Sequence, residues 1–175
     1  MLLGVPPLHA QIRGVMLEDT RPGRSAPTLE LPQVTAAGVS PVPYELAQEL
    51  GLVVVLSFCP SLADAGCLGV WRGWQEVRQV FGGGVSVVGI STDSTAAAAS
   101  LVGLAGLRGR FLSDDGGREA RRWGVRTPRP GQAAVFVISP EGRLEYRDLQ
   151  YDPLDSAAWG RLWQAVARVR MPARS

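Results

Sequence analysis

The chain has 175 residues, of which 46% are hydrophobic and 19% charged, and its net charge is only +2. This length fits a single domain, and this composition can bury a sizeable core, which excludes an intrinsically disordered chain. All 18 basic residues are arginine, and no apolar run approaches the roughly 20 residues that a membrane helix needs. We therefore expect neither nucleic acid nor a membrane as a partner.

Residues that build metal centres and disulfide frameworks are scarce. Two cysteines are too few for a disulfide-stapled secreted scaffold, and the single histidine, His9, nearly excludes a histidine-based dyad or a zinc cluster. The N-terminus has no basic region, and Pro6 and Pro7 interrupt its apolar stretch, so we expect no signal peptide. The sequence therefore predicts a cytoplasmic protein.

The chain divides into an N-terminal arm and one domain. Residues 1–24 show weak periodicity and several prolines, and the role of this arm is open. Residues 25–170 show a regular alternation of patterns without an internal repeat. We therefore place the whole domain in residues 25–170.

Hydrophobic spacing predicts the elements of this domain. Residues 52–58 form a continuous apolar and β-branched run, which is typical of a strand covered on both faces of a parallel sheet. In chain order we expect strands over 28–31, 52–58, 85–91, 110–112, 133–138 and 144–149, and helices over 44–50, 67–81, 95–104, about 118–123 and about 155–168. Alternating strands and helices that end in a hairpin predict an α/β fold with a mixed central sheet and helices on both faces.

Both cysteines lie within residues 59–67, where the strand over 52–58 gives way to a helix. In an open α/β sheet, chemistry collects beyond the carboxyl ends of the central strands. Cys67 stands at the helix start, where free N–H groups and the helix dipole stabilise a thiolate by about 0.3–1 kcal/mol, or about 2 when partly buried. The thiolate is the nucleophilic and redox-active form of cysteine, so this position predicts thiol–disulfide or thiol–peroxide chemistry.

The residues before Cys67 resemble the active-site loop of peroxiredoxins of the alkyl hydroperoxide reductase and bacterioferritin-comigratory-protein types. In that pattern a strand ends in an aromatic residue, followed by Pro, three residues, Thr, two residues and the peroxide-attacking Cys. Pro60, Gly66 and Cys67 match it. The resemblance extends over about residues 25–170, because three later segments resemble further parts of the family in the same order: 87–93, 111–125 and 135–143.

This resemblance implies a thioredoxin-like fold and a thiol peroxidase. Cys67 would be the nucleophile that attacks hydrogen peroxide or an alkyl hydroperoxide, and Pro60 and Asp64 would shape its pocket. A thioredoxin- or glutaredoxin-type donor would restore the thiol, and no cofactor or metal would be required. Members of the family often dimerise through sheet edges or helix faces, so a homodimer is also expected.

Two positions differ from the family pattern. Asp64 stands in place of Thr, and Ala133 stands near the position of an Arg that pairs with the thiolate and the peroxide. A carboxylate about 4 Å from Cys67 would cost about 4 kcal/mol at an effective dielectric near 20, which exceeds the benefit of the helix start. We therefore expect Arg126 or Arg129 to supply a compensating charge. Asp64 can equally serve as the N-terminal cap of the helix.

Cys59 stands directly before Pro60, where the family has an aromatic residue, and Arg72 stands where some relatives carry a resolving cysteine. Cys59 is therefore the one intramolecular partner that the sequence offers to a Cys67 sulfenic acid. A disulfide needs Cα atoms within about 4.4–6.8 Å, and closing it here can require the first helical turn to unwind. An inert core cysteine is the alternative interpretation of Cys59.

Two other functions stay open. A thiol–disulfide oxidoreductase would act on protein thiols through Cys59 and Cys67, although the usual Cys-x-x-Cys spacing is absent. A degenerate thioredoxin-fold protein that binds partners and catalyses little would account for the changed Thr and Arg positions.

Overall fold

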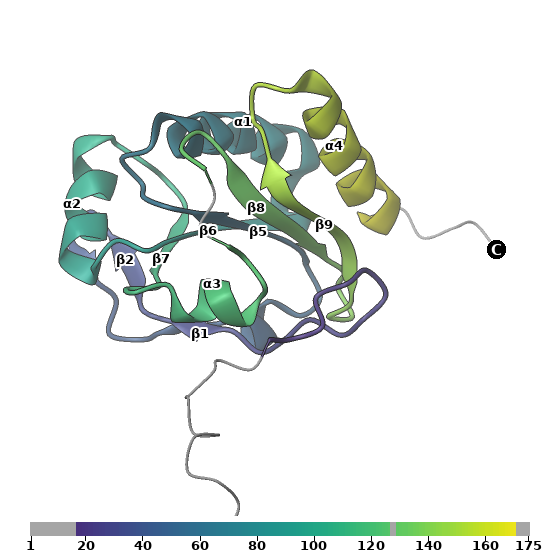
Figure 1. The fold of residues 1–175 in the computed structure, drawn as a ribbon, viewed down its shortest axis with the longest axis horizontal. Coiled ribbons are helices and arrows are strands. Elements are labelled where there is room, and N and C mark those ends of the chain that lie inside the picture. The colour runs from purple at the N-terminus through teal and green to yellow at the C-terminus, as the bar shows by residue number, and fades with distance from the viewer. Residues whose placement is uncertain (1–16, 127–128, 171–175) are drawn as a thin grey trace, which may run out of the picture.

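A seven-stranded mixed sheet forms the centre of the structure, a computed structural model that describes residues 17–126 and 129–170 (Figure 1). Its strand order is β3-β2-β7-β6-β5-β8-β9. These strands are β2 (Gln33–Thr35), β3 (Gly38–Val39), β5 (Val53–Cys59), β6 (Val85–Ser91), β7 (Arg110–Ser113), β8 (Ala133–Ile138) and β9 (Leu144–Tyr151). A separate antiparallel pair consists of β1 (Glu30–Leu31) and β4 (Tyr44–Glu45).

The centre of the sheet determines where the site lies. Strands β5, β6 and β7 run parallel, whereas β8 runs antiparallel to β5. Every residue of β5 and β6 is buried, which explains the continuous apolar runs from which the sequence predicts these strands. Cys59, the last residue of β5, pairs with Ser91, the last residue of β6. The carboxyl ends of two neighbouring strands therefore meet at one edge of the sheet.

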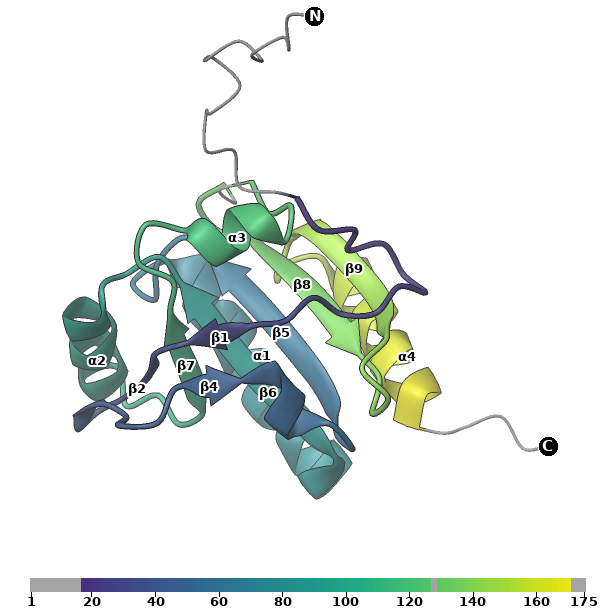
Figure 2. The same ribbon diagram turned by 90° about the horizontal axis from the view of Figure 1, so that it is seen from below.

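Helices cover both faces of this sheet, as the sequence predicts (Figures 1 and 2). Helices α1 (Ala65–Phe81), α2 (Thr95–Leu104) and α4 (Ser156–Arg170) contribute to the buried cluster on one face. The short helix α3 (Arg118–Arg122) and the β1–β4 pair lie over the other face, where Trp123 and Val125 join the second buried cluster. Two 3-10 helices complete the described elements, η2 (Leu46–Glu49) and η3 (Gly82–Gly84).

Local pattern misses the elements that depend on distant partners. Strand β2 pairs with β7, with Val34 opposite Phe111, and β3 pairs with β2, but neither strand is expected from the sequence. The helical turns expected over 44–50 begin instead as strand β4, because Tyr44 pairs with Leu31. Short edge strands of this kind are stabilised by long-range pairing, which a local hydrophobic period does not report.

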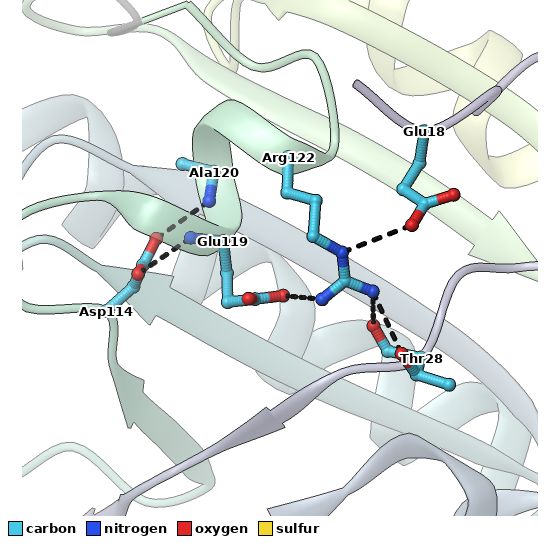
Figure 3. A network of polar contacts seen from close by, with 6 residues as sticks. All are labelled: Glu18, Thr28, Asp114, Glu119, Ala120 and Arg122. Atoms are coloured by element: carbon cyan, nitrogen blue, oxygen red, sulfur yellow. Dashed lines mark hydrogen bonds and ion pairs between the residues drawn. The ribbon is translucent and has the colours of Figure 1, made fainter. Parts of the chain in front are cut away.

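Arg122 holds the segment before β1 against α3 (Figure 3). Its guanidinium donates to Glu18 Oε1 at 3.3 Å and to Glu119 Oε2 at 2.5 Å. The same side chain donates to the carbonyl and hydroxyl oxygens of Thr28 at 2.6 and 2.9 Å. Asp114 caps α3 by accepting hydrogen bonds from the N–H groups of Glu119 and Ala120 in its first turn (Figure 3). Arg122 thereby fixes Glu18 and Thr28, near the two ends of this segment, beside α3.

Gly89 of β6 leaves the space that Trp71 of α1 fills. A Cβ atom built on Gly89 would lie 1.8 Å from Trp71 Cζ2, and the Trp71 side chain is 2% exposed. No side chain other than hydrogen fits there unless the indole moves. This contact fixes how closely α1, and with it the start of the helix that carries Cys67, approaches the sheet.

We expect Gly89→Ala to lower the free energy of unfolding by about 3 kcal/mol, because the added methyl group must displace a buried indole. Chemical denaturation measures this change. Gly69→Ala in α1 is the matched control, since nothing lies within 4 Å of a Cβ at that position and alanine favours a helix by up to about 1 kcal/mol. Equal stability of the two variants would contradict the close contact.

Candidate active site

A disulfide joins Cys59, at the end of β5, to Cys67, in the first turn of α1. The S–S distance is 2.03 Å and the Cα atoms are 5.9 Å apart. Both cysteines are buried, Cys67 completely and Cys59 to 3% exposure. The helix is intact at this point, because it begins at Ala65 and the N–H of Leu68 donates to the carbonyl of Asp64 at 3.0 Å. The expectation that closure requires the first turn to unwind is therefore wrong.

Asp64 caps the helix that carries Cys67. Its Oδ1 accepts a hydrogen bond from the Cys67 N–H at 3.2 Å, which is the contact that an N-cap side chain makes three residues ahead. The same carboxylate accepts from the N–H of Gly131 at 3.1 and 3.2 Å. Gly131 lies in the loop that leads into β8, so Asp64 ties the helix start to a neighbouring strand. This cap also explains why α1 starts two residues earlier than the sequence analysis expects.

Asp93 holds the loop between the cysteines from the other side. Its carboxylate accepts hydrogen bonds from Ser61 Oγ and the Leu62 N–H, both at 2.8 Å, and from Ser91 Oγ at 2.9 Å. The neighbouring Thr92 hydroxyl donates to the Pro60 carbonyl at 2.6 Å. Asp93 lies at the end of the segment 87–93 that resembles the family, and no role for it is predicted from the sequence. The signal that could have found it is its place just after β6, whose end lies beside the end of β5.

A cavity of about 1050 Å³ opens beside Cys59 and Pro60. Apolar residues line part of it, including Phe58 and Val125, and two arginines, Arg121 and Arg126, lie on its wall. The turn that precedes α3 also borders the cavity, through Asp115, Gly116 and Gly117. Residues that line this cavity are Leu17, Phe58, Cys59, Pro60, Thr92, Asp115, Gly116, Gly117, Ala120, Arg121, Gly124, Val125 and Arg126.

The two arginines that the sequence analysis singles out occupy different places. Arg126 borders the cavity, and Arg129 is exposed in the loop before β8. That loop reaches Asp64 through the N–H of Gly131. Ala133, near the position of the family arginine, is fully buried in the same cluster as both cysteines. The structure thus brings Cys59, Pro60 and Arg126 to one cavity, whereas Cys67 and Asp64 are not among the residues that line it.

Within residues 17–126 and 129–170, no group of three or more His, Cys, Asp or Glu side chains is arranged to hold a metal ion. Across that same part of the chain, none of the helices has the length and apolar character to cross a membrane.

Comparison with known proteins identifies similar sequences and folds. A family model described as the AhpC/TSA family matches residues 22–147. Peroxidoxin BcpB from Mycobacterium tuberculosis is 26% identical with a TM-score of 0.64, over 88% of this chain and 98% of that one. The reduced 2-Cys peroxiredoxin of Plasmodium vivax is 18% identical with a TM-score of 0.66, over 83% and 94% of the two chains.

A third similar structure is a protein described as the thiol:disulfide interchange protein DsbE of Chlorobium tepidum. It is 22% identical with a TM-score of 0.66, over 83% of this chain and 98% of that one. No curated protein matches the chain significantly. These structures share the thioredoxin-like fold, which confirms the fold expected from the sequence.

We expect Asp93→Asn to lower the free energy of unfolding by about 1–3 kcal/mol, because an amide nitrogen cannot accept the bonds that one carboxylate oxygen now receives. Thermal or chemical unfolding measures the change. Asp152→Asn is the matched control, since Asp152 accepts one hydrogen bond in an exposed turn, from the N–H of Leu154. A loss that is no larger in the Asp93 variant than in the control would show that Asp93 does not hold the loop.

Proposed function

The chain belongs to the AhpC/TSA family, and we propose that it is a thiol peroxidase that reduces hydrogen peroxide or an alkyl hydroperoxide through Cys67. Membership of this family supports a thiol-based redox enzyme. The observation that carries the proposal is the disulfide between the end of β5 and the start of α1, with 5.9 Å between its Cα atoms. Two cysteines at this distance can exchange between dithiol and disulfide while the strand and helix keep their places.

The proposed reaction has three steps. The Cys67 thiolate attacks one oxygen of the peroxide, the O–O bond breaks, and the second oxygen leaves as water or an alcohol after it takes a proton. The Cys59 thiolate then attacks the sulfur of the Cys67 sulfenic acid, so that the S–S bond forms and the hydroxyl leaves with a proton as water. A dithiol donor of the thioredoxin or glutaredoxin type returns two electrons and two protons.

The burial of the sulfur atoms determines in which form of the protein peroxide can reach Cys67. Cys67 is fully buried when the disulfide is closed, so peroxide must reach it in the dithiol form. Cys59 and Pro60 line the cavity, which supports this cavity as the approach route. Its apolar residues suit the organic part of an alkyl hydroperoxide, and Arg121 and Arg126 on its wall supply positive charge that attracts the peroxide oxygens.

Asp64 has two opposite effects on Cys67 in this proposal. As the helix cap it stabilises the turn that holds Cys67, by about 1 kcal/mol. As a carboxylate next to the Cys67 N–H it disfavours the thiolate, by up to about 4 kcal/mol at 4 Å and an effective dielectric near 20. The hydrogen bonds that Asp64 accepts from the N–H groups of Cys67 and Gly131 partly compensate the negative charge of its carboxylate. A chain with this residue attacks peroxide more slowly than the same chain with a neutral cap.

Thiol–disulfide exchange with other proteins is the second candidate function. It is supported by the likeness to a thiol:disulfide interchange protein and by the position of Cys59 at the cavity, where a partner thiol could reach it. In that case the disulfide form oxidises a reduced peptide dithiol, whether or not peroxide oxidises the protein quickly. A protein that does neither would be a binding protein of the same fold.

Stopped-flow measurement of peroxide consumption tests the proposed peroxidase. We expect the reduced protein to be oxidised much faster than free cysteine and Cys67→Ser to lose the fast reaction. Cys59→Ser is the matched control: it keeps the fast first oxidation but stops at the sulfenic acid, because the resolving thiol is gone. Oxidation of the wild-type protein at the rate of free cysteine would contradict the proposal.

We expect Asp64→Asn, in a Cys59→Ser background, to lower the pKa of Cys67 by at least about one unit, because it removes a negative charge near the thiolate. Thiolate absorbance as a function of pH measures this pKa. Glu141→Gln, in the exposed turn between β8 and β9, is the control for a change in total charge. An unchanged pKa in the Asp64 variant would show that its carboxylate does not act on the sulfur.

A further inference from the structure

Ser57 is a polar residue inside the strand that ends in Cys59. Both faces of β5 are covered, and Ser57 is completely buried between valine, leucine and phenylalanine neighbours in the sequence of that strand. Side chains two residues apart in a strand point to the same face, so Ser57 and Cys59 share one side of the sheet. A buried hydroxyl costs about 1–3 kcal/mol when it has no hydrogen-bond partner. We therefore expect the Ser57 hydroxyl to have a specific hydrogen-bond partner.

That partner is the sulfur of Cys59. Ser57 Oγ lies 3.8 Å from Cys59 Sγ, within hydrogen-bond distance for sulfur. Cys59 carries no S–H in the disulfide, so the hydroxyl of Ser57 is the donor. When the disulfide opens, the same hydroxyl faces a thiol or a thiolate. A hydrogen bond to an ionised acceptor is roughly twice as strong as one to a neutral acceptor, so it favours the thiolate over the thiol.

We propose that Ser57 is a positioning residue for Cys59, which holds and partly ionises the thiol that attacks Cys67. This inference rests on the proposed function, in which Cys59 resolves the Cys67 sulfenic acid. In that step the Cys59 thiolate forms the S–S bond, the S–O bond of Cys67 breaks, and the oxygen leaves as water with its hydrogen and one further proton. Burial in an apolar cluster raises the pKa of a thiol, and the Ser57 hydroxyl opposes that effect.

Other charged and titratable groups near Cys59 are unchanged by a substitution at Ser57. Two carboxylates flank the loop after Cys59, and Tyr151 lies in the same buried cluster as both cysteines. The remaining charged groups with described side chains on the packed elements are exposed. The charged and titratable groups near Cys59 are therefore Asp64, Asp93 and Tyr151, the cavity-lining Asp115, Arg121 and Arg126, and the exposed Arg72, Glu76, Arg161, Arg168 and Arg170. The difference between the wild type and a Ser57 variant therefore reports the hydroxyl itself.

The first measurement is the pKa of Cys59 in a Cys67→Ser background, from thiolate absorbance as a function of pH. Burial raises the pKa of all three tyrosines, Tyr44, Tyr146 and Tyr151, above the ordinary value, so phenolate forms at a higher pH than it does in a free tyrosine. We expect Ser57→Ala to raise the pKa of Cys59 by about one unit. Ser86→Ala is the matched control, because Ser86 is a buried serine of β6 that pairs with Val54, at the far end of β5 from Cys59.

The second measurement is the rate at which the Cys67 sulfenic acid closes to the disulfide near neutral pH. A one-unit rise in pKa reduces the thiolate tenfold, but a more basic thiolate is also more nucleophilic, so we expect closure to slow by about threefold in Ser57→Ala. The rate at which Cys67 is first oxidised should not change, because Ser57 contacts Cys59. Ser86→Ala should leave both rates unchanged.

An unchanged Cys59 pKa in Ser57→Ala, or an equal shift in Ser86→Ala, would overturn the inference. The pKa measurement needs no peroxide, so it fails or succeeds independently of the proposed peroxidase. If Cys59 shifts as expected but Cys67 does not react with peroxide, the role of Ser57 stands and the proposed function fails. If the pKa shifts and closure keeps its rate, the hydroxyl does not assist resolution and the inference fails.

Discussion

The loop that leads from β5 into α1 is fixed by two carboxylates, and the position of both cysteines depends on it. Strand β6 runs parallel to β5, so its carboxyl end brings Asp93 beside the loop, where it binds Ser61 and Leu62. Strand β8 runs antiparallel to β5, so its amino end brings Gly131 beside Asp64. Each neighbour of β5 therefore contributes one tether. A mixed sheet provides this arrangement because the two neighbours approach the same edge with opposite ends.

The cap at Asp64 gives a structural reason for the residue type at this position. Ser, Thr, Asp and Asn are the preferred N-cap residues, so the threonine of the family pattern and the aspartate here can both begin the helix. They differ in what they do to the sulfur, because a hydroxyl can donate a hydrogen bond to a thiolate and a carboxylate cannot. A threonine and the aspartate present here can thus both cap the helix, but they differ in the charge that they place near Cys67.

The sequence predicts the elements with strong local patterns and misses those formed by distant pairing. The buried run of β5, the helix of α1 and the closing hairpin are confirmed, because each has its own hydrophobic period. The proximity of Cys59 to Cys67 follows from the strand-to-helix connection, but the hydrogen bond from Gly131 to Asp64 does not, since it comes from the distant loop before β8. The contact between Ser57 and Cys59 needs the face of the strand to be known. The role of Asp93 can be predicted only when it is known that β6 is the neighbour of β5 in the sheet.

We propose that Cys59 and Cys67 cycle between dithiol and disulfide within one chain. Intact mass spectrometry under non-reducing conditions tests it most directly, on reduced protein treated with one equivalent of peroxide. We expect a monomer that has lost two hydrogens, with no thiol left to alkylate. A monomer that has gained two oxygens on Cys67 while Cys59 still alkylates, or a dimer linked by a disulfide, would contradict it.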